Sequence, residues 1–136
     1  MRSITVPATD EDPTPVIDFV QEELAQYDCP QRAIYQIEVA IEEIFVNIVR
    51  YGGLSDKDGV EIRCDVLDGP LRVVIQFLDG GVPFDPMAKA DPDTSPEATM
   101  EREGGLGIFM VKQMMDDVSY AYENGKNTLT ILKNLK

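Results

Sequence analysis

The long amphipathic segment from Gln31 to Tyr51 constrains the fold more than any other part of the sequence. Its apolar stripe consists of isoleucines at helical spacing: Ile34, Ile37, Ile41, Ile44 and Ile48. The glycine pair Gly52-Gly53, directly after the segment, is a stop signal for a helix. Because a helix of this kind buries only one stripe, it has to lie on a second layer of structure. The sequence therefore predicts a long helix packed against another layer.

Runs of alternating apolar and polar residues predict that the second layer is a β-sheet. In residues 60–66 and 71–77 the apolar side chains of each run share one face, and a turn at residues 68–70 separates the runs. Asn124-Gly125 marks the turn of a later hairpin. The expected strands cover residues 2–8, 60–66, 71–77, 118–122 and 128–132.

Two shorter helices complete the expected elements. One begins at an Asp12 cap with Pro13 in its first turn and ends near Tyr27, and the other spans residues 107–116. The order of the elements predicts an α/β (α+β) fold, a two-layer sandwich whose helices cover one face of a mixed, mostly antiparallel sheet. A chain of 136 residues with 43% apolar residues fits one core, so residues 1–136 are expected to form a single domain.

A polar segment over residues 86–103 interrupts this pattern. It has no apolar periodicity, and Pro86, Pro92 and Pro96 forbid a continuous helix. A segment of this length without regular structure is unusual inside a compact domain and is often a functional lid. We therefore expect a lid over residues 86–103.

Charge and composition exclude several classes of partner and site. The formal net charge is −13 at pH 7, whereas nucleic acids and anionic membranes attract basic surfaces, so neither is an expected partner. The sequence has no run of about 18 apolar residues that could span a membrane, and a cytoplasmic location is expected. With two cysteines and no histidine, neither a disulfide framework nor a usual zinc site is expected, and Cys64 is assigned to the core.

A glycine-rich turn precedes the last expected helix. Gly104, Gly105 and Gly107 run directly into it, so unpaired backbone N–H groups and the positive end of the helix dipole would face the turn. This arrangement suits phosphate, which can approach closely where side chains are absent. A tight structural connection is the commoner meaning of such a motif when it stands alone.

Three polar side chains lie at positions suited to chemistry. Glu43 and Asn47 are four residues apart and so stack on one side of the long helix, where their oxygens suit Mg²⁺ held jointly with substrate phosphates; a solvated helix face is the alternative. Asp79 continues the parity of the apolar residues in its strand. Its carboxylate is thus expected to point towards the apolar layer, which is costly unless a partner hydrogen-bonds it.

Taken together, these motifs resemble the three nucleotide-binding boxes of the GHKL ATPase superfamily, also called the Bergerat fold. Residues 43–47, Glu-Ile-Phe-Val-Asn, match the N box, residues 79–86 match the first glycine box, and residues 103–107, Glu-Gly-Gly-Leu-Gly, match the second. Within that superfamily the chain is most similar to the anti-sigma-factor serine/threonine kinases, which also have an acidic pair, here Asp116-Asp117, before the last hairpin.

The resemblance implies a role for each matched position, with ATP and Mg²⁺ as cofactors. Glu43 would be the general base that activates a hydroxyl, Asn47 the Mg²⁺ ligand, and Asp79 the acceptor for the adenine amino group.

The resemblance implies that the two glycine boxes contact the adenine ring and the phosphates of ATP. Gly81 would let the adenine ring approach the backbone closely, and Gly104-Gly105-Leu106-Gly107 would form the phosphate-binding turn. Arg102 would reach phosphate from the lid or be an ordinary surface arginine. Family members often have a histidine where this sequence has Tyr51, and no phosphorylatable histidine is present, which argues against a sensor histidine kinase.

Three functions are consistent with these features. The first is an ATP-dependent serine/threonine protein kinase that acts as an anti-sigma factor, phosphorylating a STAS-type anti-anti-sigma partner and binding a sigma factor; the resemblance also implies pairing into a homodimer. The second is a non-catalytic ATP- or ADP-binding module that switches its affinity for a partner. The third is an acidic metal-binding or interaction protein without a nucleotide.

Overall fold

The computed structural model describes residues 1–8, 11–52, 54, 58–85 and 106–135. The strands are β1 (Arg2–Pro7), β2 (Gly59–Leu67), β3 (Arg72–Asp79), β4 (Asp117–Glu123) and β5 (Lys126–Asn134). The helices are α1 (Thr14–Leu24), α2 (Gln31–Tyr51) and α4 (Leu106–Met114). The expected lid lies outside the described residues.

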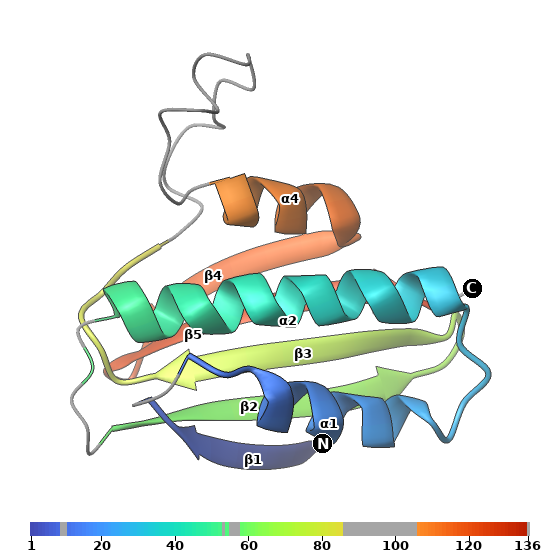
Figure 1. Cartoon of the computed structure of the whole chain (residues 1–136), viewed down its shortest axis with the longest axis horizontal. Helices are drawn as coiled ribbons and strands as arrows, with labels where there is room; N and C mark the ends of the chain where they lie inside the picture. The colour runs from blue at the N-terminus through green and yellow to red at the C-terminus, as the bar shows by residue number, and fades with distance from the viewer. Residues whose placement is uncertain (9–10, 53, 55–57, 86–105, 136) are drawn as a thin grey trace.

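The five strands form one sheet in the order β1-β2-β3-β5-β4. Each neighbouring pair is antiparallel, so the antiparallel character that the sequence predicted is confirmed and no parallel pair occurs among the described strands. Figure 1 shows α1 and α2 on the same face of this sheet, with α4 beside α2 and close to β4. The predicted two-layer sandwich with helices on one face is therefore confirmed.

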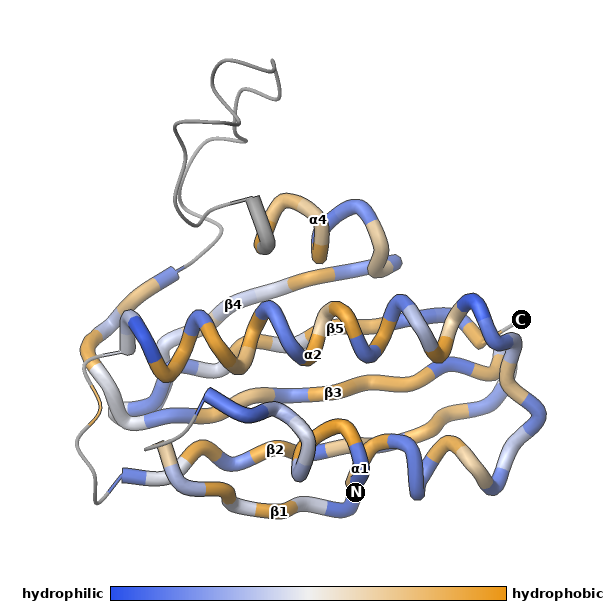
Figure 2. Tube along the Cα trace, in the orientation of Figure 1, coloured by the Kyte–Doolittle hydropathy of each residue, from blue (hydrophilic) through white to orange (hydrophobic). Residues whose placement is uncertain are grey.

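Helix α2 has the bounds that its sequence predicts, Gln31 to Tyr51. Hydrophobic and hydrophilic positions alternate along it in Figure 2, as expected of a helix with one apolar stripe. Of the predicted stripe, Ile37, Ile41 and Ile44 are buried, while Ile34 and Ile48 are partly buried at its margins. The stripe lies on the inner face of the sheet, whose buried residues include Val60, Ile62, Cys64, Val73, Ile75, Phe77, Leu129 and Ile131.

Helix α1 is shorter than predicted. The predicted cap at Asp12 is wrong by one residue, because the helix begins at Thr14 and Pro13 occupies the N-cap position without a side-chain capping bond. Oδ1 of Asp12 accepts a hydrogen bond from the backbone N–H of Thr14 at 3.0 Å, in the turn that leads into the helix. The helix ends at Leu24 instead of Tyr27, because the N–H of Tyr27 bonds to the carbonyl of Leu24 in a tighter turn, at 3.0 Å. Tyr27 is consequently exposed.

The final hairpin turns where its sequence predicts. Asn124 and Gly125 both have positive φ, 54° and 76°, as a two-residue turn matched to the twist of the strands requires. Both strands are longer than the pattern indicated, and β5 begins at Lys126. Asn127 is thereby included in β5, opposite Asp79 of β3.

Within the described residues, no helix combines the length and the apolar character needed to cross a membrane. Cys64 is buried in the core as expected, and burial raises the pKa of its thiol to about 12. The thiol is therefore protonated at neutral pH and serves as an apolar packing group.

Candidate functional site

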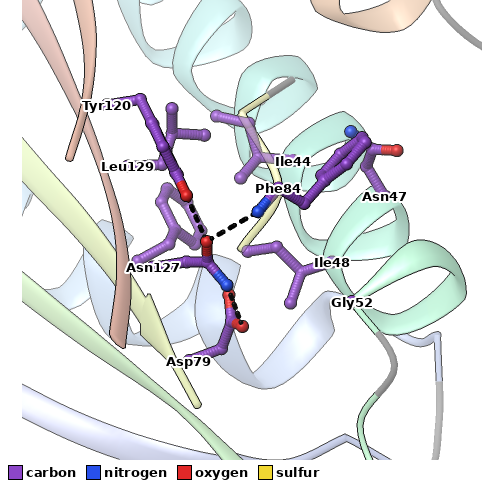
Figure 3. A pocket seen from close by; sticks show the side chains of 10 residues that line it. Ile44, Asn47, Ile48, Gly52, Asp79, Phe84, Tyr120, Asn127 and Leu129 are labelled. Atoms are coloured by element: carbon purple, nitrogen blue, oxygen red, sulfur yellow. Dashed lines mark hydrogen bonds between the residues drawn. The ribbon is translucent and has the colours of Figure 1, made fainter. Parts of the chain in front are cut away.

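A pocket lies between α2 and the inner face of the sheet, where β3 ends and β5 begins (Figure 3). Three predicted or newly recognised polar side chains line it: Asn47 from α2, Asp79 from β3 and Asn127 from β5. Apolar and aromatic groups form the rest of the wall, together with the end of α2: Ile44, Ile48, Gly52, Phe77, Phe84, Tyr120 and Leu129. A mainly apolar wall with a few convergent polar groups is typical of a small-molecule site.

Asp79 points to the interior, as the parity of its strand predicts. It is the last residue of β3 and is 5% exposed. Its Oδ1 accepts a hydrogen bond from the backbone N–H of Gly81 at 2.9 Å and a second from Nδ2 of Asn127 at 3.1 Å. These two bonds offset part of the cost of burying the carboxylate.

Asn127 is a site residue that the sequence analysis missed. It is 6% exposed, and its side chain joins three parts of the pocket. Nδ2 donates to Asp79 and, at 2.9 Å, to the carbonyl of Val82, while the carbonyl of Gly81 lies 3.5 Å away. Oδ1 accepts from the backbone N–H of Phe84 at 3.0 Å and from the hydroxyl of Tyr120.

The neighbours of Asn127 determine the orientation of its amide. An N–H group and a hydroxyl donate to its oxygen, and a carboxylate and a carbonyl accept from its nitrogen. If the oxygen and nitrogen were exchanged, donors would face donors and acceptors would face acceptors. Burial raises the pKa of Tyr120, which keeps the phenol protonated and able to donate. The parity signal that found Asp79 also applies here, because Asn127 shares a face with Leu129 and Ile131.

Gly81 is buried against the end of α2. A Cβ atom at this position would lie 2.0 Å from the carbonyl oxygen of Gly52 and 3.0 Å from Oδ1 of Asp79. The N–H of Val82 also donates to the carbonyl of Gly52 at 3.1 Å. The first glycine box therefore packs directly on the helix that carries the N box, and a glycine is required there by the backbone of Gly52.

The two candidate side chains of α2, Asn47 and Glu43, differ in how they relate to the pocket. Asn47 is partly buried and lines the cavity from α2 (Figure 3). Glu43 is also partly buried and lies one turn earlier, but it is not among the residues that line the pocket. Neither side chain makes a hydrogen bond to another described residue.

The predicted phosphate turn is described only in part. Arg102, Gly104 and Gly105 lie outside the described residues. Leu106 and Gly107 belong to the first turn of α4, so the helix begins directly after the glycine pair, one residue earlier than predicted. Tyr51, at the end of α2, is 51% exposed.

Comparison with known proteins supports the fold. A crystal structure of the RsbU and RsbW domains of a Mycobacterium tuberculosis protein has the same fold, with a TM-score of 0.67 and 19% sequence identity over 99% of this chain and 33% of that chain. Several sequence relatives are named serine-protein kinase RsbW, including proteins from Listeria monocytogenes and Bacillus subtilis. The protein from Listeria monocytogenes serovar 1/2a is 31% identical over 97 residues, covering 68% of this chain and 61% of its own length.

The second relative, from Bacillus subtilis strain 168, is 28% identical over 95 residues, covering 68% of this chain and 59% of its own length. The chain thus spans about three fifths of the length of these relatives. Residues 6–133 match the family described as the histidine kinase-like ATPase domain. The family match, the shared fold and the ordered boxes agree, and the chain belongs to the histidine kinase-like ATPase domain family, as the GHKL resemblance implies.

Proposed function

We propose that this chain is an ATP-dependent serine/threonine protein kinase that acts as an anti-sigma factor. In this proposal it phosphorylates a hydroxyl on an anti-anti-sigma partner and binds a sigma factor, and it acts in the cytoplasm, where ATP is available. The observation that carries the proposal is the buried Asp79 carboxylate on the wall of the pocket, within a family of ATPase domains. The name serine-protein kinase, given to several relatives, supports the phosphoryl-transfer reaction.

In this proposal, different residues contact the adenine ring and the phosphates of ATP. Asp79 accepts a hydrogen bond from the exocyclic amino group of adenine, since the remaining oxygen of a buried carboxylate favours a donor. The apolar walls, which include Ile48 and Phe84, cover the faces of the ring. The glycine turn before α4 contacts the phosphates through backbone N–H groups.

Mg²⁺ is the metal that this reaction requires, and the donor chemistry of α2 suits it. Asn47 offers a carboxamide oxygen at the pocket wall, and Mg²⁺ commonly takes only one or two protein oxygens together with substrate phosphates. When bound, the ion neutralises negative charge on the phosphates. Asn47 would hold it.

Glu43 is proposed as the group that accepts the proton. As the serine oxygen of the partner forms its bond to the γ-phosphorus, the bond from that phosphorus to the leaving oxygen of ADP breaks and the hydroxyl proton passes to the Glu43 carboxylate. The absence of a hydrogen bond from Glu43 to any described residue leaves both oxygens available for this role.

Two measurements test the proposal. Calorimetry with ATP and Mg²⁺ should give an affinity in the micromolar range, roughly −8 kcal/mol, and Asp79→Asn should weaken it. Labelled ATP should then transfer its phosphate to a candidate partner domain. If the wild-type protein binds ATP no better than the Asp79→Asn, Asn47→Ala double variant, the nucleotide site is wrong; if it binds ATP but transfers to no partner, the non-catalytic switch replaces the kinase.

A further inference from the structure

The acceptor sites of Asp79 are unequally used, and this bears on which base the pocket accepts. An ionised carboxylate has about four acceptor sites, two on each oxygen. Both hydrogen bonds to this side chain end on Oδ1, from the N–H of Gly81 and from Nδ2 of Asn127. No described residue donates to Oδ2, although Asp79 lines the pocket. One oxygen is therefore filled by the protein and the other is available to a ligand.

Adenine and guanine place different demands on such a carboxylate. Adenine has one exocyclic amino group next to an acceptor nitrogen, so it needs a single acceptor oxygen. Guanine has two adjacent donors, N1–H and the 2-amino group, and they match a carboxylate only when each of its oxygens accepts one. Once the N–H groups of Gly81 and Asn127 occupy Oδ1, only one of the two guanine donors can bond to the carboxylate. The other donor is left buried without a partner, which is costly.

We propose that Asn127 is a specificity-determining residue, which selects adenine over guanine by occupying Oδ1 of Asp79. This inference rests on the proposed ATP site. Asn127 suits the role because it is 6% exposed and its amide is held at both ends. Figure 3 shows the bonds to Asp79 at one end and to Phe84 and Tyr120 at the other, and Nδ2 also donates to the carbonyl of Val82. It cannot withdraw from Oδ1 without breaking bonds to the first glycine box.

The direct test compares ATP, GTP and ITP as Mg²⁺ complexes, each displacing a fluorescent ATP analogue from the full chain. In the wild type, ATP should bind best, and GTP should bind more weakly than ITP, since GTP alone carries the 2-amino group that finds no acceptor. Asn127→Ala frees an acceptor site on Oδ1. In that variant the preference for ATP over GTP should fall by about tenfold or more, and GTP should bind more tightly than ITP.

Tyr120→Phe is the matched control, because it removes a donor to Asn127 Oδ1 and leaves the bond from Nδ2 to Asp79 in place. Its overall nucleotide affinity can fall, but the ratio of ATP to GTP affinity should stay within about twofold of the wild type. Thermal unfolding identifies any variant that does not fold, and Asn127→Val, whose branched side chain fills more of the space and carries no donor, then replaces Asn127→Ala.

The outcomes separate the inference from the proposed function. If the wild type does not bind ATP, the nucleotide site itself is wrong. If the wild type binds ATP but a folded Asn127 variant keeps the wild-type ratio of ATP to GTP affinity, Asn127 does not determine specificity. Equal binding of GTP and ITP by that variant would contradict the role of the freed Oδ1 site.

Discussion

The two sides of the pocket differ in how much the protein itself has already arranged. On the sheet side, Asp79 and Asn127 are 5% and 6% exposed and share a hydrogen-bonded network with Phe84 and Tyr120. On the α2 side, Asn47 lines the pocket and Glu43 lies one turn earlier, outside its lining. Both are only partly buried, and neither makes a hydrogen bond to another described residue.

Under the proposed function, the difference follows from what each side has to recognise. A purine is a rigid neutral ring, and a site that reads it gains from side chains held in one position before binding. Phosphates and Mg²⁺ bring their own charges and donor atoms, so the groups that meet them need to be free to rearrange. A substitution on the sheet side should therefore change affinity and stability, and a substitution on the α2 side should change the rate or the metal dependence.

The largest effect is expected at Glu43. Glu43→Gln keeps the shape of the side chain but removes the base, so phosphate transfer should fall by roughly 10²–10⁴ while ATP affinity changes little. Single-turnover transfer and calorimetry on the same preparations measure both quantities. Glu42→Gln is the control, since Glu42 is exposed and lies on the opposite flank of α2; transfer by Glu43→Gln at the wild-type rate would remove Glu43 from the mechanism.

A large loss of stability is expected at Gly81. In Gly81→Ala the new Cβ would lie 2.0 Å from the backbone oxygen of Gly52, and relieving this clash should cost roughly 1–3 kcal/mol of unfolding free energy. ATP affinity should fall as well. The neighbouring Gly80→Ala is the control, because its Cβ would meet no atom within 4 Å. Denaturant unfolding of both variants gives the comparison, and equal stabilities would mean that the Gly52 contact is not maintained in solution.

A smaller effect, confined to metal dependence, is expected at Asn47. The wild-type protein should bind ATP more weakly once EDTA removes Mg²⁺, and Asn47→Ala should abolish most of that difference, roughly tenfold or about 1.4 kcal/mol. Asp79→Asn serves as the contrast, since it should weaken binding to a similar extent with and without the metal. If Mg²⁺ strengthens ATP binding by Asn47→Ala as much as by the wild type, the ion is held by other residues.

The smallest effect is expected at Tyr120. Tyr120→Phe removes one hydrogen bond to Asn127 and should cost about 0.5–1.5 kcal/mol of unfolding free energy at neutral pH. Burial raises the pKa of Tyr120 above its ordinary value of 10.0, so this contribution is complete below pH 10.0 and is lost as the pH rises through the raised value of the folded state. The difference between wild type and variant should therefore shrink in strongly alkaline solution.

Tyr122→Phe is the control for the Tyr120 experiment, since Tyr122 lies on the same strand and is 45% exposed. Its substitution should change the unfolding free energy by less than about 0.5 kcal/mol. Equal losses for the two tyrosines would indicate that the hydroxyl of Tyr120 does not support the Asn127 network.

Local patterns in the sequence predicted each described helix and strand, although not all of their bounds, and named Asn47 and Asp79, which both line the pocket. The bounds of α2 were predicted correctly because its stripe is continuous and glycines follow it. The inward direction of Asp79 followed from the parity of its own strand. The early end of α1 was not predicted, because the turn that ends it depends on where Tyr27 donates its N–H.

The sequence by itself determined the two layers, the inward carboxylate and the order of the boxes, because periodicity and parity are properties of consecutive residues. Only the tertiary structure decided that Asn127 faces Asp79, through the register of β5 on β3, and that Gly81 rests on Gly52. These pairs are 48 and 29 residues apart in the chain, counted as 127 − 79 and 81 − 52. Parity within one strand determines which face a side chain points to, but it does not determine which residue of another strand or helix that side chain meets.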